Sequence, residues 1–158
     1  SLHSGPPAAA TVACVSAVGK PVTLQERRVG VDLSRRAWME YARRLDREPV
    51  RFRDAVLRVA KGEGGYVVVV AENHGAGYLQ VEYTIASNTL RFSRGQSATR
   101  DWLPPKHAML LQFGSPIDPS GSSSWQSSHK FQLVMQPPSQ APHQPPLPAG
   151  DLHAPFRL

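Results

Sequence analysis

The spacing of apolar residues predicts a helix near residue 40. Apolar side chains recur at intervals of three and four positions, the spacing of one face of an α-helix, at Trp38, Tyr41, Ala42 and Leu45. Ser34 comes before them, and its hydroxyl can accept a hydrogen bond from an unpaired backbone amide of the first turn. We therefore expect this helix to begin at Ser34 and to end before Pro49.

The same spacing continues beyond Pro49. The apolar positions of this stretch are Phe52, Ala55, Val56, Val59 and Ala60. Gly62 follows them, at the place where a helix commonly ends in a left-handed residue. A strand over residues 50–59 is the alternative, but its alternation of apolar and polar positions is broken on both faces. We therefore predict a second short helix here.

From residue 66 the apolar positions recur every second residue, as they do in strands. Residues 78–86 alternate most clearly, with Leu79, Val81, Tyr83 and Ile85 on the face expected to point inward. Short turns separate these segments, so hairpins are expected, and Trp102 in the connection at 94–106 should pack on the core. The predicted meander has strands at 66–71, 78–86, 89–93, 107–113 and 130–135, and short strands are expected earlier at 11–18, 22–24 and 29–33.

Composition divides the chain of 158 residues into three parts. Residues 1–10 are small residues and prolines and predict a flexible leader. Residues 136–158 hold seven of the 15 prolines and predict an extended, weakly ordered tail. Between them, residues 11–135 suit a single α+β domain, in which an antiparallel β-meander sheet carries a two-helix layer on one face.

Charge is concentrated in one segment. Residues 20–62 contain twelve basic and six acidic side chains, so this segment carries the whole net charge of +6. A candidate basic patch on the helical layer consists of Arg35, Arg36, Arg43, Arg44, Arg47 and Arg51. Clustered arginines can bind a polyanion by releasing its counterions. The six interleaved acids favour instead a solvated, salt-bridged surface or a basic surface that meets an acidic protein.

The tail offers a candidate peptide motif. Pro145, Pro146, Leu147 and Pro148 have the Pro-Pro-Leu-Pro pattern that WW domains bind, and their spacing also fits PxxP. A plain proline-rich linker explains the same residues, since no arginine flanks them as SH3 domains usually require.

Motifs for catalysis, cofactors and metals are not found. The six histidines show no metal-ligand spacing, and the single cysteine, Cys14, excludes a multi-cysteine zinc site. We therefore expect no cofactor and no metal. A lone cysteine favours a reducing compartment, the cytoplasm or nucleus, and no apolar run reaches the roughly 18 residues that a membrane span needs.

These features predict a non-catalytic protein-interaction module. It would use its basic helical layer or an open sheet edge, and its partner would be another protein or a second copy of the chain. A single-stranded nucleic-acid (RNA) binding domain that uses the basic patch is the alternative. An enzyme of unknown class is the second alternative.

Overall fold

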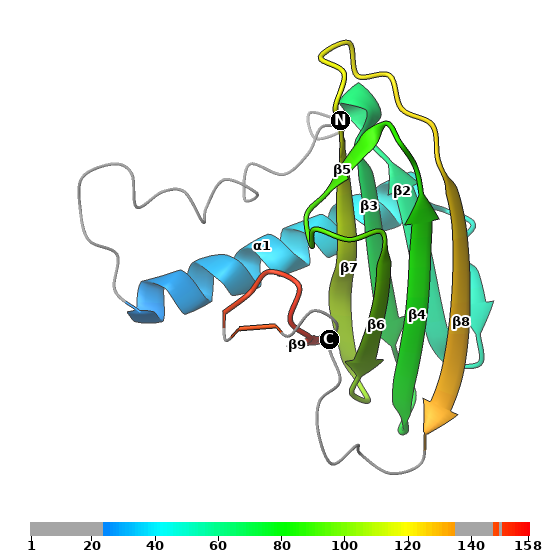
Figure 1. The fold of residues 1–158 in the computed structure, drawn as a ribbon. Helices are drawn as coiled ribbons and strands as arrows, with labels where there is room; N and C mark the ends of the chain where they lie inside the picture. The colour runs from blue at the N-terminus through cyan, green and yellow to red at the C-terminus, as the bar shows by residue number, and fades with distance from the viewer. Residues whose placement is uncertain (1–23, 135–146, 149) are drawn as a thin grey trace.

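The protein is described by a computed structural model that covers residues 24–134, 147–148 and 150–158. In this part of the chain one α-helix packs on a sandwich of two antiparallel sheets (Figure 1). The prediction of an α+β fold with an antiparallel sheet is confirmed. The prediction of a two-helix layer is wrong, because the second predicted helix is a pair of strands.

The helix is longer than the sequence pattern predicts. Helix α1 spans Leu24–Leu45, so Ser34 lies inside it and does not cap it. The short strand predicted at 29–33 is also wrong, because these residues belong to the same helix. Trp38, Tyr41 and Ala42 are buried as predicted, whereas Leu45 is 38% exposed at the end of the helix.

The predicted second helix is a β-hairpin. Strand β1 (Val50–Phe52) turns at Arg53 and Asp54 into strand β2 (Ala55–Lys61), with Phe52 opposite Ala55. Arg53 has a φ of 52°, in the left-handed region that tight hairpin turns require. Strand β2 is covered on one face by the other sheet and on the other face by α1. Because both faces of β2 are covered, its sequence lacks the alternation of apolar and polar residues by which a strand is normally recognised.

The chain alternates between the two sheets. The larger sheet has the order β1-β2-β3-β7-β5, with β9 also paired to β7, and the smaller has the order β6-β4-β8. The strands are β3 (Val67–Asn73), β4 (Tyr78–Ala86), β5 (Leu90–Phe92), β6 (Ala98–Leu103), β7 (His107–Pro116), β8 (Gln126–Val134) and β9 (Phe156–Arg157), and a 3₁₀ turn (Glu63–Gly65) links β2 to β3.

This alternation makes the predicted meander wrong. Strand β4 pairs with β6 and β8 but not with β3, and β5 pairs with β7. The loop after β3 therefore crosses between the sheets, and Asn73 fixes it by donating to the carbonyl oxygens of Gly77 and Leu103 at 2.9 and 3.0 Å. A hairpin and such a crossing use the same polar turn residues, so the local sequence does not separate them.

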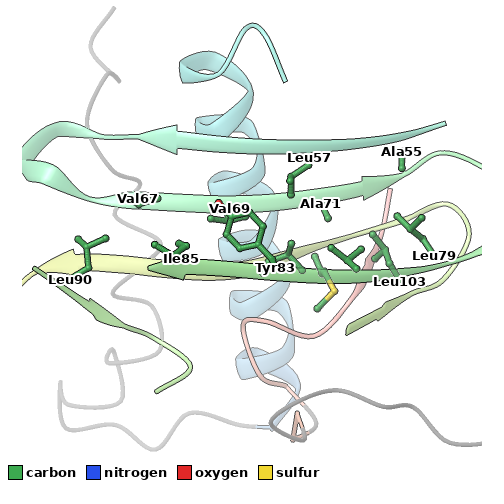
Figure 2. Close-up of a cluster of buried hydrophobic side chains, with 13 residues drawn as sticks. Ala55, Leu57, Val67, Val69, Ala71, Leu79, Tyr83, Ile85, Leu90 and Leu103 are labelled. Atoms are coloured by element: carbon green, nitrogen blue, oxygen red, sulfur yellow. The ribbon is translucent and has the colours of Figure 1, made fainter. Parts of the chain in front are cut away.

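The core has two layers. Between the sheets, side chains of β2 and β3 meet those of β4, and Figure 2 shows Leu57 and Val69 facing Tyr83 and Ile85. The second layer lies between the larger sheet and α1, where Trp38 packs near Val68 and Val70. All four predicted inward residues of β4 are buried in the first layer, between the two sheets: Leu79, Val81, Tyr83 and Ile85.

The connection predicted at 94–106 contains strand β6. Leu103, at the end of β6, is fully buried between the sheets. Trp102 is adjacent to it and so lies on the opposite, outer face, where it is only partly buried. Leu103 therefore occupies the core place that the sequence pattern assigned to Trp102.

The last residues of the predicted tail pack on the larger sheet. Strand β9 pairs with β7, and the amide of Leu158 donates to the carbonyl oxygen of Lys106 at 2.9 Å. Phe156 is buried against α1, and Leu152 and Leu158 pack beside it. The predicted leader at 1–10, the strand predicted at 11–18 and Cys14 lie outside the described residues, as does the strand predicted at 22–24 except for Leu24, which is the first residue of α1.

Candidate interaction surface

Arg35 and Arg36 lie on α1 and contact the end of the chain. The guanidinium of Arg35 donates to the backbone carbonyl of Asp151, and that of Arg36 donates to the backbone carbonyl of Arg157 at 2.7 Å. The Arg36 guanidinium also lies 5.7 Å from the centre of the Phe156 ring. These two members of the predicted basic patch therefore hold the C-terminal segment against the helix.

Arg43 joins the helix to a buried carboxylate. Glu72 on β3 is 1% exposed and accepts hydrogen bonds from Arg43 at 2.8 Å, Arg58 at 2.9 Å and His74 at 2.9 Å. Arg43 also pairs with Glu40 at 2.7 Å. Burial acts to raise the pKa of Glu72, but the hydrogen bonds from the three partners outweigh it and lower the pKa to about 2.

The other three predicted arginines lie on different elements. Arg44 is exposed on α1, with its guanidinium 5.8 Å from the ring centre of Tyr41. Arg47 is exposed in the loop after the helix, and Arg51 is exposed on β1. Three of the six arginines therefore stabilise the fold through their own contacts, and binding of a partner by the six stays a prediction.

The predicted peptide motif is described only in part. Pro145 and Pro146 lie outside the described residues. Leu147 is partly buried and packs against the core between the sheets, while Pro148 is exposed. Since Leu147 contacts its own domain, a WW or SH3 domain would have to displace it.

One side of the sandwich is closed by a buried ion pair. Arg94 donates to both carboxylate oxygens of Asp101 at 2.7 and 2.8 Å, and the two side chains are 1% and 0% exposed. Arg94 also donates to the carbonyl oxygen of Leu111 at 3.3 Å, and its amide donates to the side chain of Gln112 at 3.1 Å. Asp101 is on β6 and Leu111 on β7, so the network joins the two sheets along this side.

The opposite side of the sandwich is open. Strand β8 pairs along one edge with β4, and no described strand pairs with its other edge (Figure 1). Phe131 and Leu133 stand opposite the core residues Val81 and Leu79, so they point toward the interior of the sandwich. Leu133 is nevertheless 39% exposed and Phe131 only partly buried, because none of the described strands covers them fully.

Strand β1 supplies the facing half of this side. Val50 and Phe52 stand opposite the core residues Leu57 and Ala55, so they too point toward the smaller sheet. Val50 is 38% exposed, and the Phe52 ring stacks on Phe131 with 5.5 Å between their centres. We call the surface formed by Val50, Phe52, His129, Phe131 and Leu133 the open side.

Aromatic and basic groups continue along the open side. The imidazole of His129 lies 5.4 Å from the Phe131 ring, and the guanidinium of Arg53 lies 5.8 Å from the Phe52 ring. A pocket of about 130 Å³ adjoins its end, between Phe52, Leu133 and the turns that join β1 to β2 and β3 to β4. The open side thus combines an apolar surface, a small pocket and a strand edge that no described strand pairs with.

A serine–histidine contact fixes the C-terminal segment to the larger sheet. The Ser93 hydroxyl lies 3.0 Å from Nε2 of His153, and Nδ1 of His153 donates to the carbonyl oxygen of Leu110 at 2.5 Å. Burial lowers the pKa of His153, so the ring is neutral at pH 7. Ser93 also accepts a hydrogen bond from the amide of Phe113 at 2.9 Å, which makes the pair part of the sheet's own bonding.

Sequence reasoning missed most of these residues for one reason. The fold brings Arg94 together with Asp101, and Ser93 together with His153, although their separations in the sequence match no known motif. Ser93 and His153 are the farther apart in the chain. The open side had a partial signal, since the alternation within the strand predicted at 130–135 places Phe131 and Leu133 on one face.

The described residues provide neither a metal site nor a membrane-spanning helix. They contain no group of three or more His, Cys, Asp or Glu side chains that could hold a metal ion. None of the described helices is long and apolar enough to span a membrane.

Comparison with known proteins identifies the family. No curated protein and no solved structure matches the chain significantly. The model of the Calpain-D-like C-terminal domain family matches residues 46–138, which is more than half of the chain and includes strands β1 to β8. This chain therefore belongs to the Calpain-D-like C-terminal domain family.

Proposed function

We propose that this Calpain-D-like C-terminal domain is a non-catalytic protein-interaction module that binds its partner at the open side. The observation that carries the proposal is the asymmetry of the sandwich. A buried ion pair closes the β6 side, whereas the β8 side keeps an unpaired edge and exposed inward-facing side chains. Aromatic residues and arginine are enriched in protein–protein interfaces relative to the rest of the surface, and Phe52, Phe131 and Arg53 lie together here.

The alternative functions have less support. An RNA-binding surface on α1 needs free guanidinium groups, but Arg35, Arg36 and Arg43 are bound to groups of the fold itself. An enzyme needs a reactive group at a substrate site, but the Ser93–His153 contact is part of the sheet and suggests no reaction class. For location we propose the cytoplasm or nucleus, because the single cysteine suits a reducing compartment.

Selection of peptides on the immobilised chain tests the proposal. A random peptide library is displayed on phage, and the affinities of selected peptides are then compared for Leu133→Glu and Leu33→Glu. Both leucines are exposed, at 39% and 60%, but only Leu133 belongs to the open side. A buried carboxylate at the interface should weaken binding about ten-fold or more in Leu133→Glu and leave Leu33→Glu unchanged.

Two outcomes would contradict the proposal. One is that no specific peptides are selected, and the other is that both variants bind equally while their melting temperatures match the wild type. A labelled single-stranded RNA is measured in parallel at about 50 and 200 mM salt. Salt-sensitive RNA binding that Leu133→Glu leaves intact would favour the nucleic-acid alternative.

A further inference from the structure

We infer that the open side takes one extended peptide strand with alternating apolar and acidic residues, which adds to the smaller sheet beside β8. The inference rests on the proposed function and specifies the partner's chemistry. The apolar side chains of the added strand point inward onto Val50 and Phe52, and its acidic side chains point outward beside Lys130.

The backbone of β8 is suited to accept such a strand. All nine of its residues pair with β4 in one unbroken register, from Tyr78 opposite Val134 to Ala86 opposite Gln126. Its free edge therefore presents a regular row of amide and carbonyl groups, every second residue facing outward. Exposed edges are usually protected by a proline, a bulge or a charge, and β8 has neither proline nor bulge.

The width of the two sheets shows where the added strand would lie. Among the described residues the larger sheet has six strands and the smaller has three. Phe131 on β8 stacks on Phe52, so β1 lies across from the edge of the smaller sheet. A fourth strand next to β8 would therefore lie along the outer edge of β1 and cover Val50, which is now 38% exposed. Inward positions of this strand need apolar side chains.

Charge defines the outward positions. Lys130 alternates with Phe131 along β8 and stands opposite Glu82, so it lies on the outer face of the smaller sheet. Arg53 at the end of β1 adds a second exposed cation next to the Phe52 ring. Acidic side chains directly beside Lys130 form favourable cross-strand pairs, whereas basic ones are repelled. Asp54 lines the pocket at the end, so the preference for acids applies to the middle of the strand.

The same charge argues against a second copy as the occupant. Lys130 is the middle residue of β8. If two β8 strands paired antiparallel over their full length, each Lys130 would stand opposite the other. Like charges directly opposite each other destabilise a strand pair. A different protein with acidic residues fits the edge better.

Two labelled peptides test the preference for acidic residues. Each has nine residues, the length of β8, one alternating Val with Glu and the other alternating Val with Lys. Fluorescence anisotropy with the full chain should show about ten-fold tighter binding of the Val/Glu peptide. Lys130→Glu should abolish this preference, whereas Arg91→Glu should keep it, since Arg91 is an exposed arginine on β5, away from β8.

N-methylation of the Val/Glu peptide tests strand addition itself. One version is methylated at every Val and the other at every Glu, so each blocks the amides along one edge of the peptide. An added strand uses only one edge for β8, so one version should lose binding and the other keep it. Equal effects of the two versions would overturn the inference.

The results separate this inference from the proposed function. Library peptides that depend on Leu133, together with no preference for Val/Glu, would overturn the inference and leave the interaction module standing. Hydrogen exchange of the full chain without peptide shows whether the outer edge of β8 is already occupied. If the amides on both edges of β8 are protected, the chain's own segment or a second copy occupies the edge, and the inference is wrong.

Discussion

Glu72 is a side chain whose environment makes the stability of the domain depend on pH. It is a buried carboxylate on β3, joined to α1 through Arg43 and to β2 through Arg58. A buried charge is tolerated only when it is paired and hydrogen-bonded, and here three donors meet one carboxylate. One residue thus fixes the helix to the sheet.

The domain should lose stability in acid because of this group. Glu72 has a pKa of about 2 in the folded protein and 4.5 ordinarily, so the unfolded chain binds the proton more readily. The contribution is complete above pH 4.5 and disappears as the pH falls through 2. The full shift corresponds to about 3 kcal/mol, most of which is lost by pH 3. Urea unfolding between pH 6 and pH 3 measures it.

Glu72→Gln is the control for this pH dependence. Glutamine does not titrate, so the variant should be less stable at pH 6 and its free energy of unfolding should fall less steeply toward pH 3. If the two proteins show the same slope, another carboxylate causes the acid sensitivity.

At the scale of elements, β2 shows how a strand can have the pattern of a helix. Leu57 faces the other sheet while Ala60 faces α1, so both faces of β2 are apolar. Apolar residues therefore fall at almost any spacing, and a spacing of three or four is found by chance. The strand β4 was predicted with its correct bounds because its outer face is only partly covered, and Glu82 and Thr84 keep the alternation.

Strand β9 is too short to hold itself in place. It has two residues, so the segment 150–158 depends on contacts from Arg36 and His153. Arg36→Ala combined with His153→Ala should release the segment while the sandwich stays folded. Hydrogen exchange should then accelerate at the amide of Leu158 and stay slow in β4.

Arg47→Ala is the matched control, because Arg47 is an exposed arginine in the loop after α1. It should leave the exchange of Leu158 unchanged. Slow exchange of Leu158 in the double variant would mean that the remaining contacts, the hydrogen bond from Arg35 to Asp151 and the apolar packing of Phe156 and Leu152, are enough to hold the segment.

At the scale of the whole molecule, the sequence predicts most strands but not the sheet that each joins. Five of the described strands, β3, β4, β5, β7 and β8, were expected near their observed positions. Their assignment to two alternating sheets depends on contacts between residues far apart in the chain, which local periodicity does not contain. The candidate site could not be predicted for the same reason, because the open side joins β1 and β8, which are far apart in the sequence.

The closed side provides the last prediction. Asp101→Asn keeps the shape of the side chain but leaves the guanidinium of Arg94 buried without its counter-charge. Breaking a buried ion pair in this way costs about 3–5 kcal/mol, whereas replacing both partners by apolar residues is often neutral. Asp101→Asn should therefore be strongly destabilised in urea, and Arg94→Met with Asp101→Leu should recover most of the loss. Because the double variant keeps the β6 side closed by apolar packing, binding of the Val/Glu peptide at the open side should not change. A loss below about 1 kcal/mol in Asp101→Asn would show that water reaches Arg94, and the contrast between a closed and an open side would no longer hold.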